Sequence, residues 1–357
     1  MTRGFFEAKD DENLIFHHDA YTGLKAVVAI YSTALGPALG GLRFYPYARG
    51  EDAVDDAIRL ARAMAHKNAL AGLALGGGKA VIIGDPSTDK TPELLRAYAQ
   101  VVQSLEGRYV TACDAGTSTE DMDLIARDCT YVVGTSTSRG GAGDPSLLTA
   151  YGVFRGMAAC AEHVWGTPSL AGRRVGVAGV GKVGTRLVQL LVENGASVLI
   201  SDIHDEAIDV ARRAHPAVDV AVDTDNLIRS DLEIYAPCAM GGSLDDHAVS
   251  QIRARIVCGA ENNQLQRESL AADLHHRQVV YAPDYVVNAG GVIHVAQELG
   301  GAGGREAELR VAAIYETTKE ILERAAEQGI SPAVIAQQRA EERIRTADRG
   351  RQVASAR

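Results

Sequence analysis

The chemistry that the residue types of this chain indicate most directly is the binding of a dinucleotide. Gly179, Gly181 and Gly184 stand at G-x-G-x-x-G spacing, directly after an apolar run at residues 174–178. In this pattern the first glycine permits a tight turn, the second lets a pyrophosphate approach the next helix, and the third lets helix and strand pack closely. Asp202 follows about twenty residues later, where a carboxylate can bind the ribose diol and repel a 2′-phosphate. The pattern predicts NAD rather than NADP; the alternative is a turn that needs glycine only for its shape.

A second glycine cluster, residues 76–78, is followed by Lys79, and Lys67 precedes it. The cluster lacks the GxxxxGK[ST] spacing of a phosphate-binding loop. Three glycines beside a lysine suggest a backbone that approaches a ligand closely, although each lysine alone is most simply a solvated surface charge. Further clusters lie at residues 35–41 and 288–291, and physical reasoning from the sequence does not assemble these clusters into one site.

The elements that must position these residues alternate between strand and helix. Apolar runs predict strands and helical spacing predicts helices, and Ser118 and Asp121 stand near capping-box spacing. In the first half we expect strands at 24–30, 80–83, 108–112 and 131–133, and helices at 51–73 and 118–126. The polar, glycine-rich residues 135–145 indicate a boundary between domains.

The second half continues the alternation, which is typical of a parallel, doubly wound sheet. We expect strands near 174–178, 197–201, 232–236, 255–258 and 278–281, helices near 146–163 and 182–194, and one or two tail helices at 306–343. Residues 347–357 are expected to be frayed.

Composition sets outer limits on function. The 357 residues favour two domains, and 36 Lys and Arg against 46 Asp and Glu give a net charge of −10. This balance argues against nucleic acid and anionic membrane partners, which need clustered basic residues. The five cysteines are widely spaced without C-x-x-C, so we expect no disulfide framework, no metal and a reducing cytoplasm. The N-terminus is acidic, so we expect no signal peptide. The longest uncharged stretch, residues 26–42, is interrupted by glycines and a proline, so we expect no membrane span.

Several stretches, in order over nearly the whole chain, resemble the amino acid dehydrogenases for glutamate, leucine, phenylalanine and valine. These stretches read LGPALGGLRFYPY, MAHKNALAGLALGGGKAVIIGDP, TACDAGTSTEDMD, GGAGDPSLLTAYGV, GVAGVGKVG, APCAMGG and YAPDYVVNAGGVIHVA. The leucine and valine branch is most similar, valine dehydrogenases in particular. The resemblance implies two α/β domains with a cleft between them. Residues 1–134, completed by a C-terminal helix at 330–357, would bind substrate and form a homo-oligomer, at least an isologous dimer. Residues 135–329 would form a Rossmann-type NAD domain.

The family's catalytic roles fall on matching positions. By resemblance, Lys67 binds the substrate α-carboxylate, Lys79 is the general base that activates water, and Asp114 relays protons. Lys79 would have to lose its proton near neutral pH, which burial and a neighbouring cation favour. The implied reaction is reversible oxidative deamination of an L-amino acid to a 2-oxo acid and ammonium. The alternative of a different class, an inactive NAD-binding regulatory protein, predicts damage at one of these three residues, and all are present.

Other residues are assigned to the cofactor by resemblance. Thr149 would hold the nicotinamide carboxamide, and the backbone at Cys238 and Ala239 would lie against the nicotinamide ribose. The expected cofactor-binding residues are Thr149, Gly179, Val180, Gly181, Lys182, Val183, Gly184, Asp202, Cys238 and Ala239. Hydride transfer needs a dry site, so residues 139–143 are expected to form a hinge.

The substrate side chain would meet an apolar pocket, which the resemblance places at Leu39, Ala112, Val292 and Val295. Glutamate-specific relatives carry a lysine and a hydroxyl at the positions of Leu39 and Val295, and burying a carboxylate here would cost several kcal/mol. Phenylalanine-specific relatives tend to have glycine at Ala112. We therefore expect a branched-chain aliphatic amino acid, without a choice among valine, leucine and isoleucine; the alternative is phenylalanine or another hydrophobic amino acid.

The substrate backbone would pass beside Gly40 and Gly41. Asn262 and Asn263 resemble the amides near the substrate carboxylate and the nicotinamide, and either could make either contact. Three residues depart from the family's pattern, His66, Glu261 and His294. They are either neutral changes or added charges near the nicotinamide that tune pH dependence or substrate range.

Overall fold

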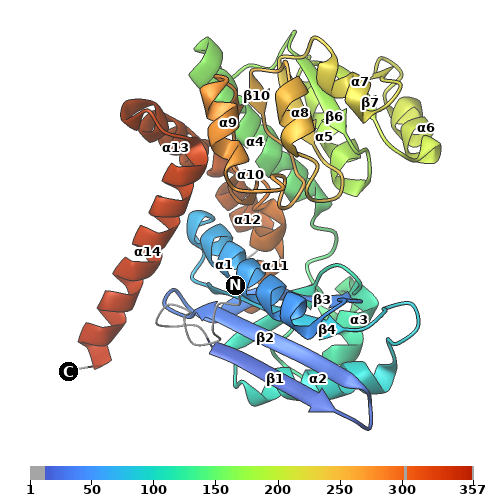
Figure 1. Ribbon diagram of the computed structural model, residues 1–357, viewed down its shortest axis with the longest axis vertical. Coiled ribbons are helices and arrows are strands. Elements are labelled where there is room, and N and C mark those ends of the chain that lie inside the picture. The colour runs from blue at the N-terminus through green and yellow to red at the C-terminus, as the bar shows by residue number, and fades with distance from the viewer. Residues whose placement is uncertain (1–12, 301–303, 356–357) are drawn as a thin grey trace. The chain divides into compact units, whose positions relative to one another are not determined.

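The computed structural model describes residues 13–300 and 304–355, which divide into two compact units. Unit 1 comprises residues up to 143, 295–302 and 340 onward, and unit 2 comprises 144–294 and 303–339. Helices α11 (Gly290–Gly300) and α14 (Pro332–Ser355) therefore each belong partly to both units (Figure 1). The division at 143/144 falls at the end of the glycine-rich segment in the sequence.

Unit 1 is built on a mixed sheet of five strands in the order β1-β2-β4-β3-β5. The strands are β1 (Asn13–Asp19), β2 (Leu24–Ser32), β3 (Ala38–Tyr45), β4 (Gly76–Ile83) and β5 (Tyr109–Cys113). The helices are α1 (Gly50–Leu70), α2 (Pro92–Ser104) and α3 (Thr119–Ile125), with a 3₁₀ turn at Thr137–Arg139. β2 pairs antiparallel with β1 and β4, whereas β3 pairs parallel with β4 and β5.

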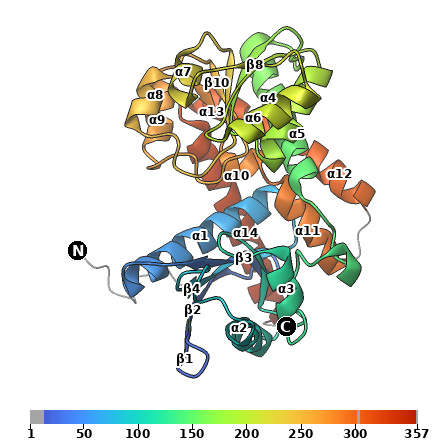
Figure 2. The ribbon, with the colours of Figure 1, turned by 90° about the vertical axis from the view of Figure 1, so that its right-hand side faces the viewer.

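Alternation along the strands gives unit 1 two apolar layers, one on each face of the sheet. Val27, Ala29 and Val81 pack against α1, while their neighbours Val28 and Ile82 pack against α2 and α3. Figure 2 shows α1 and α2 on opposite faces of this sheet. Residues of β3 and β4 on the Val81 side therefore face α1, and this parity places the side chains of the site.

Unit 2 is built on six parallel strands in the order β11-β10-β9-β6-β7-β8. The strands are β6 (Arg174–Ala178), β7 (Ser197–Ser201), β8 (Asp219–Val220), β9 (Ile234–Pro237), β10 (Ile256–Val257) and β11 (Val280–Tyr281). The helices are α4 (Ser146–Trp165), α5 (Lys182–Glu193), α6 (Asp205–Ala214), α7 (Thr224–Arg229), α8 (Asp246–Gln251), α9 (Leu270–His276), α10 (Asp284–Val287), α12 (Gly304–Ala312) and α13 (Ile314–Gln328). Helices α7, α8 and α9 share a buried core with the sheet, and α4 packs against α5 and α13.

Most of the expected elements are confirmed, including the strands at 174–178 and 197–201, the capping box at Ser118 and the parallel sheet of the second half. Three expectations were wrong. The tail forms three helices, α12, α13 and α14, instead of one or two at 306–343. Residues 131–133 form only an isolated bridge, between Val132 and Thr111, because their backbone bonds to β5 are limited to the amide and carbonyl of Thr111. Residues 347–355 continue α14 instead of fraying, while residues 356–357 lie outside the described part. Among the described residues, no helix is long and apolar enough to cross a membrane.

Candidate active site

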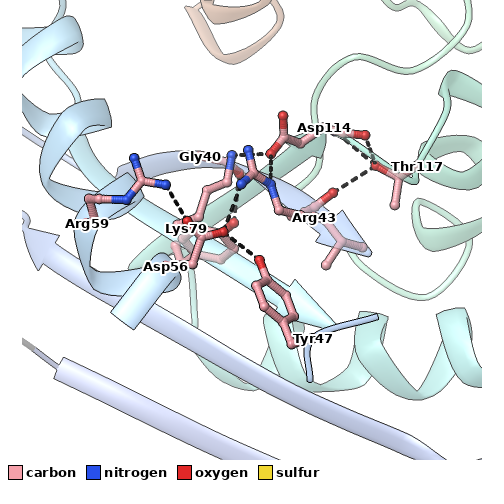
Figure 3. A network of polar contacts seen from close by, with 10 residues as sticks. Gly40, Arg43, Tyr47, Asp56, Arg59, Lys79, Asp114 and Thr117 are labelled. Atoms are coloured by element: carbon pink, nitrogen blue, oxygen red, sulfur yellow. Dashed lines mark hydrogen bonds and ion pairs between the residues drawn. The ribbon is translucent and has the colours of Figure 1, made fainter. Parts of the chain in front are cut away.

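An ion pair between the buried Lys79 and the half-buried Asp114 is the centre of the candidate site in unit 1. Lys79 lies on β4 opposite Ala29 of β2, so its side chain is on the α1 face of the sheet. Its Nζ lies 2.5 Å from Oδ2 of Asp114, and only 7% of the lysine side chain is exposed (Figure 3). The structure therefore brings together the two residues that the sequence assigned to acid–base chemistry.

Asp114 follows β5 directly and is held by both its backbone and its carboxylate. Its amide donates to Oγ1 of Thr117, which in turn donates to the carbonyl of Leu42. Arg43 Nε donates to the same Oδ2 that contacts Lys79, at 3.2 Å. Burial alone would raise the pKa of Asp114, but the charges of Lys79 and Arg43 outweigh it and hold this pKa at about 2. Asp114 is therefore an ionised acceptor at neutral pH.

The glycines of β3 are required by the closeness of neighbouring strands. A Cβ on Gly40 would lie 1.7 Å from the carbonyl oxygen of Gly78, and one on Gly41 would lie 2.8 Å from Cβ of Asp114. Tyr109 OH donates to the carbonyl of Gly40 at 2.7 Å and fixes this strand. Side chains at these two glycines would push β3 away from β4 or from Asp114.

The glycine cluster at residues 76–78 is required by the packing of neighbouring elements. A Cβ on Gly76 would lie 1.9 Å from the carbonyl of Ser32, and one on Gly77 would lie 2.1 Å from the amide of Ala65 in α1. Packing of neighbouring elements therefore requires these glycines, and the approach of a ligand to this backbone stays a prediction. These glycines let β2 and α1 pack tightly on β4 and so set the depth at which Lys79 is buried.

The other residues expected around the substrate are distributed over both units. Lys67 lies half-buried in the last turn of α1. Leu39 is buried, and Ala112 lies on the neighbouring strand β5, where it pairs with Gly41. Val295 belongs to unit 1 and Val292, one turn earlier in α11, belongs to unit 2.

The G-x-G-x-x-G turn in unit 2 joins β6 to α5, as its sequence predicts. Gly179 has φ +95°, and a Cβ on Gly184 would lie 2.0 Å from the Gly179 carbonyl oxygen, so packing within the turn requires both glycines. Gly181 is different, because no atom of the described residues beyond its chain neighbours lies within 4 Å of a Cβ built there. The start of α5 is therefore open at Gly181, which leaves room for a pyrophosphate.

Asp202 lies beside this turn at the end of β7. Its Oδ2 accepts from the Val180 amide at 2.8 Å and its Oδ1 accepts from the His204 amide at 3.0 Å. Lys182 and Val183 form the first residues of α5. A carboxylate held against the glycine turn is suitably placed for a ribose diol.

Three further residues expected to bind the cofactor, Thr149, Cys238 and Ala239, lie in or after other elements of unit 2. Thr149 lies in the first turn of α4 and donates its hydroxyl to the Pro145 carbonyl at 2.9 Å. Cys238 follows β9, and burial raises the pKa of its thiol to about 12. Ala239 is exposed, but its amide would lie 2.8 Å from a Cβ on Gly179. The structure therefore brings Cys238 and Ala239 to the glycine turn.

Asn262 and Asn263 are fixed by two residues that the sequence analysis did not identify. Asn288 Nδ2 donates to Oδ1 of Asn262 at 2.9 Å, and the Asn263 amide donates to Oδ2 of Asp284 at 2.5 Å. Asn263 has φ +52°, a conformation that asparagine tolerates better than most residues. The NAGG run had marked Asn288 in the sequence without indicating this contact.

The three departures from the family's pattern have different surroundings. His66 is buried in unit 1, where burial and Arg62 lower its pKa to about 4, so it adds no charge at neutral pH. Glu261 is buried and accepts from the amide and hydroxyl of Ser243. His294 is half-buried in α11.

Sequence reasoning missed the group that supports Asp114, namely Arg43, Tyr47, Asp56 and Thr117. Arg43 and Tyr47 lie within a motif that carries the family resemblance. No physical rule from the sequence could connect Arg43 with a carboxylate on another strand.

Comparisons with known proteins identify the family of this chain. Residues 13–131 match the family described as Glu/Leu/Phe/Val dehydrogenase, dimerisation domain, and residues 199–349 match Glutamate/Leucine/Phenylalanine/Valine dehydrogenase. A valine dehydrogenase of Streptomyces virginiae is 55% identical over 334 residues, 93% of either chain. A leucine dehydrogenase of Bacillus subtilis is 46% identical over 97% of this chain and 95% of its own. The crystal structure of L-tryptophan dehydrogenase from Nostoc punctiforme has a TM-score of 0.82 and 38% identity, covering 94% of this chain and 96% of its own. The chain belongs to the glutamate, leucine, phenylalanine and valine dehydrogenase family of amino acid dehydrogenases.

Proposed function

We propose that this protein catalyses the reversible, NAD-dependent oxidative deamination of a branched-chain aliphatic L-amino acid. The observation that carries the proposal is the Lys79–Asp114 ion pair on a fold shared with amino acid dehydrogenases. The matched valine and leucine dehydrogenases indicate the substrate class. NAD, when bound, supplies the acceptor for the hydride that leaves the substrate Cα.

The residues of unit 1 move the protons of this reaction. Lys79 takes a proton from the water that adds to the iminium carbon. Asp114, ionised at neutral pH, relays this proton from the Lys79 ammonium to the amine of the carbinolamine. The amine then leaves as ammonia while the neutral Lys79 takes the proton of the carbinolamine hydroxyl, which gives the 2-oxo acid. Lys67 holds the substrate α-carboxylate by a charge-assisted hydrogen bond. Backbone at Gly40 and Gly41 borders the substrate.

The residues of unit 2 hold the cofactor. Gly181 leaves room for the pyrophosphate, and Asp202 binds the adenosine ribose diol and disfavours a 2′-phosphate. Thr149, Cys238 and Ala239 orient the nicotinamide end. Asn262 and Asn263, fixed by Asn288 and Asp284, contribute amides near the substrate carboxylate and the nicotinamide.

Apolar residues define the substrate side chain. Leu39, Ala112, Val292 and Val295 offer no charge to a glutamate side chain, which favours an aliphatic one. A second candidate is the same reaction on an aromatic amino acid, because the matched tryptophan dehydrogenase has this fold at 38% identity. The match to a dimerisation domain supports a homo-oligomer, at least a dimer.

NADH absorbance with a panel of L-amino acids tests the function. We expect turnover with valine, leucine and isoleucine, and little with glutamate. Lys79→Ala should lower kcat by about 10²-fold or more, within the range for general acid–base groups, and leave NAD affinity unchanged. Lys25→Ala, an exposed lysine on the neighbouring strand β2, is the matched control and should behave as wild type. Wild-type protein without turnover of any aliphatic amino acid would overturn the proposal.

A further inference from the structure

Arg43 is a charged residue beside the Lys79–Asp114 pair to which the proposed reaction gives no role. It lies on β3 opposite Val81 of β4, so its side chain is on the same α1 face of the sheet as Lys79. Its Nε lies 3.2 Å from Oδ2 of Asp114, the oxygen that Lys79 Nζ contacts at 2.5 Å. One carboxylate oxygen therefore receives two cations from adjacent strands (Figure 3).

The other edge of the Arg43 guanidinium is anchored to α1. Its NH1 donates to Oδ2 of Asp56 at 2.8 Å, and Tyr47 OH donates to the same oxygen at 2.5 Å. Arg59 NH2 contacts the second oxygen of Asp56 at 2.5 Å from the exposed side. Burial alone would raise the pKa of Asp56, but the Tyr47 hydrogen bond and the charges of Arg43 and Arg59 outweigh it and lower this pKa. Asp56 is therefore a fixed anion behind Arg43.

Only a guanidinium can make this bridge. Its planar fork presents donors along different edges, so contacts to two carboxylates fix both its position and its plane. Lysine has a single charged nitrogen on a flexible stem and would have to choose between Asp56 and Asp114. The Arg43 side chain is 22% exposed and that of Asp56 is 12% exposed, which limits screening of these contacts by water.

We propose that Arg43 is a positioning residue of the deamination, held by Asp56 and Tyr47 so that its Nε fixes the Asp114 carboxylate throughout the reaction. The proposal rests on the proposed function, in which Lys79 alternates between its charged and neutral forms. Each time Lys79 is neutral, Asp114 loses the charge of that partner. Arg43 stays protonated at every stage, so it keeps the carboxylate in place and favours its ionised form between proton transfers.

The test compares Arg43→Ala with Arg59→Ala in the full-length protein. Both variants remove an arginine that contacts Asp56, but only Arg43 also reaches Asp114. We expect Arg43→Ala to lower kcat by about 10- to 100-fold, as misplacement of a reacting group does, with little change in KM for the amino acid or in NAD affinity. Arg59→Ala should keep the wild-type kcat.

Chemical rescue separates positioning from a general loss of structure. Ethylguanidinium added to Arg43→Ala should restore activity with saturation, whereas sodium chloride at the same ionic strength should not. Arg43→Lys should remain impaired because it cannot bridge two carboxylates. An unchanged kcat in Arg43→Ala, or an equal loss of kcat in Arg59→Ala, would overturn the proposal. Turnover by the wild-type protein would still support the proposed function in that case.

A second variant serves if Arg43→Ala fails to fold. Asp56→Asn keeps the Arg43 side chain but removes the negative charge that anchors it, so kcat should fall by several-fold. Ethylguanidinium should not rescue this variant, because Arg43 itself is still present. An unchanged kcat in Asp56→Asn would contradict the anchoring role. Absence of turnover in the wild-type protein would instead overturn the proposed function, and with it the role of Arg43.

Discussion

Glu261 is a buried carboxylate, and its surroundings both favour and disfavour the ionised form. Its two oxygens accept from the Ser243 amide at 2.9 Å and the Ser243 hydroxyl at 2.7 Å. Burial raises the pKa of Glu261 to about 7, the nearby charge of Asp284 adds to this, and the Ser243 hydrogen bonds oppose it. The folded protein therefore binds a proton at Glu261 more tightly than the unfolded chain does, where the ordinary value is 4.5.

This difference predicts a pH-dependent effect of Glu261→Gln. The contribution of Glu261 to the free energy of unfolding is fully present below pH 4.5 and is lost as the pH rises to about 7. Glutamine does not titrate, and its amide can both accept from and donate to Ser243. Relative to wild type, the variant should therefore gain stability between these two pH values and keep that gain above them.

Urea unfolding at pH 5 and pH 8 measures this effect. Glu268→Gln, an exposed residue of the same unit, is the control and should show no such difference. An effect of Glu261→Gln that is the same at both pH values would contradict burial of an ionisable Glu261 side chain.

At the same scale, the sequence predicted the types of the site residues better than their supports. Lys79 and Asp114 followed from the family resemblance, and the structure places them in contact. Arg43 and Asp56 did not follow, because hydrogen bonds between different elements have no local sequence signal. Their contact depends on the parity of β3 and on where α1 crosses the sheet.

The C-terminal half of α14 completes the end of α1. Arg343 donates from NH1 to the Ala69 carbonyl and from NH2 to the Leu73 carbonyl, the latter at 3.0 Å. Arg62 of α1 pairs with Glu341 of α14 at 2.6 Å. The Ala69 carbonyl also accepts from the Gly72 amide at 3.2 Å, and Leu73 lies just beyond the helix, so Arg343 adds a charged donor to the C-terminal end of α1. These contacts lie in the turn that carries Lys67 and just beyond it.

Arg343→Ala should therefore destabilise the protein by about 1–3 kcal/mol, the usual cost of removing charged hydrogen bonds. It should also raise KM for the amino acid, since the end of α1 would hold Lys67 less firmly. Arg345→Ala, an exposed arginine on the same helix, controls for helix propensity and net charge. Thermal unfolding and steady-state kinetics of the two variants are the measurements, and equal behaviour of both would rule out the supporting role.

Two elements with strong local patterns were predicted correctly, whereas α2 was missed although Thr91 and Pro92 mark its start. The apolar run of β2 and the capping box of α3 carry their own signals. β3 contains two glycines, which disfavour strands, and only its parallel partners β4 and β5 make it a strand. The sequence marked β3 as a glycine cluster and so missed the strand that carries Arg43.

At the scale of the whole molecule, the two units have separate apolar cores. The core residues of unit 1 lie in β2–β5 and α1–α3, and those of one face of unit 2 lie in its parallel sheet and α7–α9. The NAD residues Gly179, Gly181 and Asp202 all belong to unit 2, and Lys79 and Asp114 belong to unit 1. A ligand of one unit should therefore stabilise that unit first.

Hydrogen exchange followed by mass spectrometry tests this expectation. NAD at about 100 times its Kd should add about 2.7 kcal/mol to the stability of the unit that binds it, which slows exchange through opening of that unit about 100-fold. Peptides from β6 and β9 should show this protection, whereas those from β2 and β4 should change far less.

Gly181→Val is the matched control. The added side chain meets no atom of the described residues beyond the chain neighbours within 4 Å at its Cβ, so the variant should fold but exclude the pyrophosphate. Its unit 2 peptides should lose the protection. Equal protection of both units would show that they open as one cooperative body, and protection that survives in Gly181→Val would place the cofactor elsewhere.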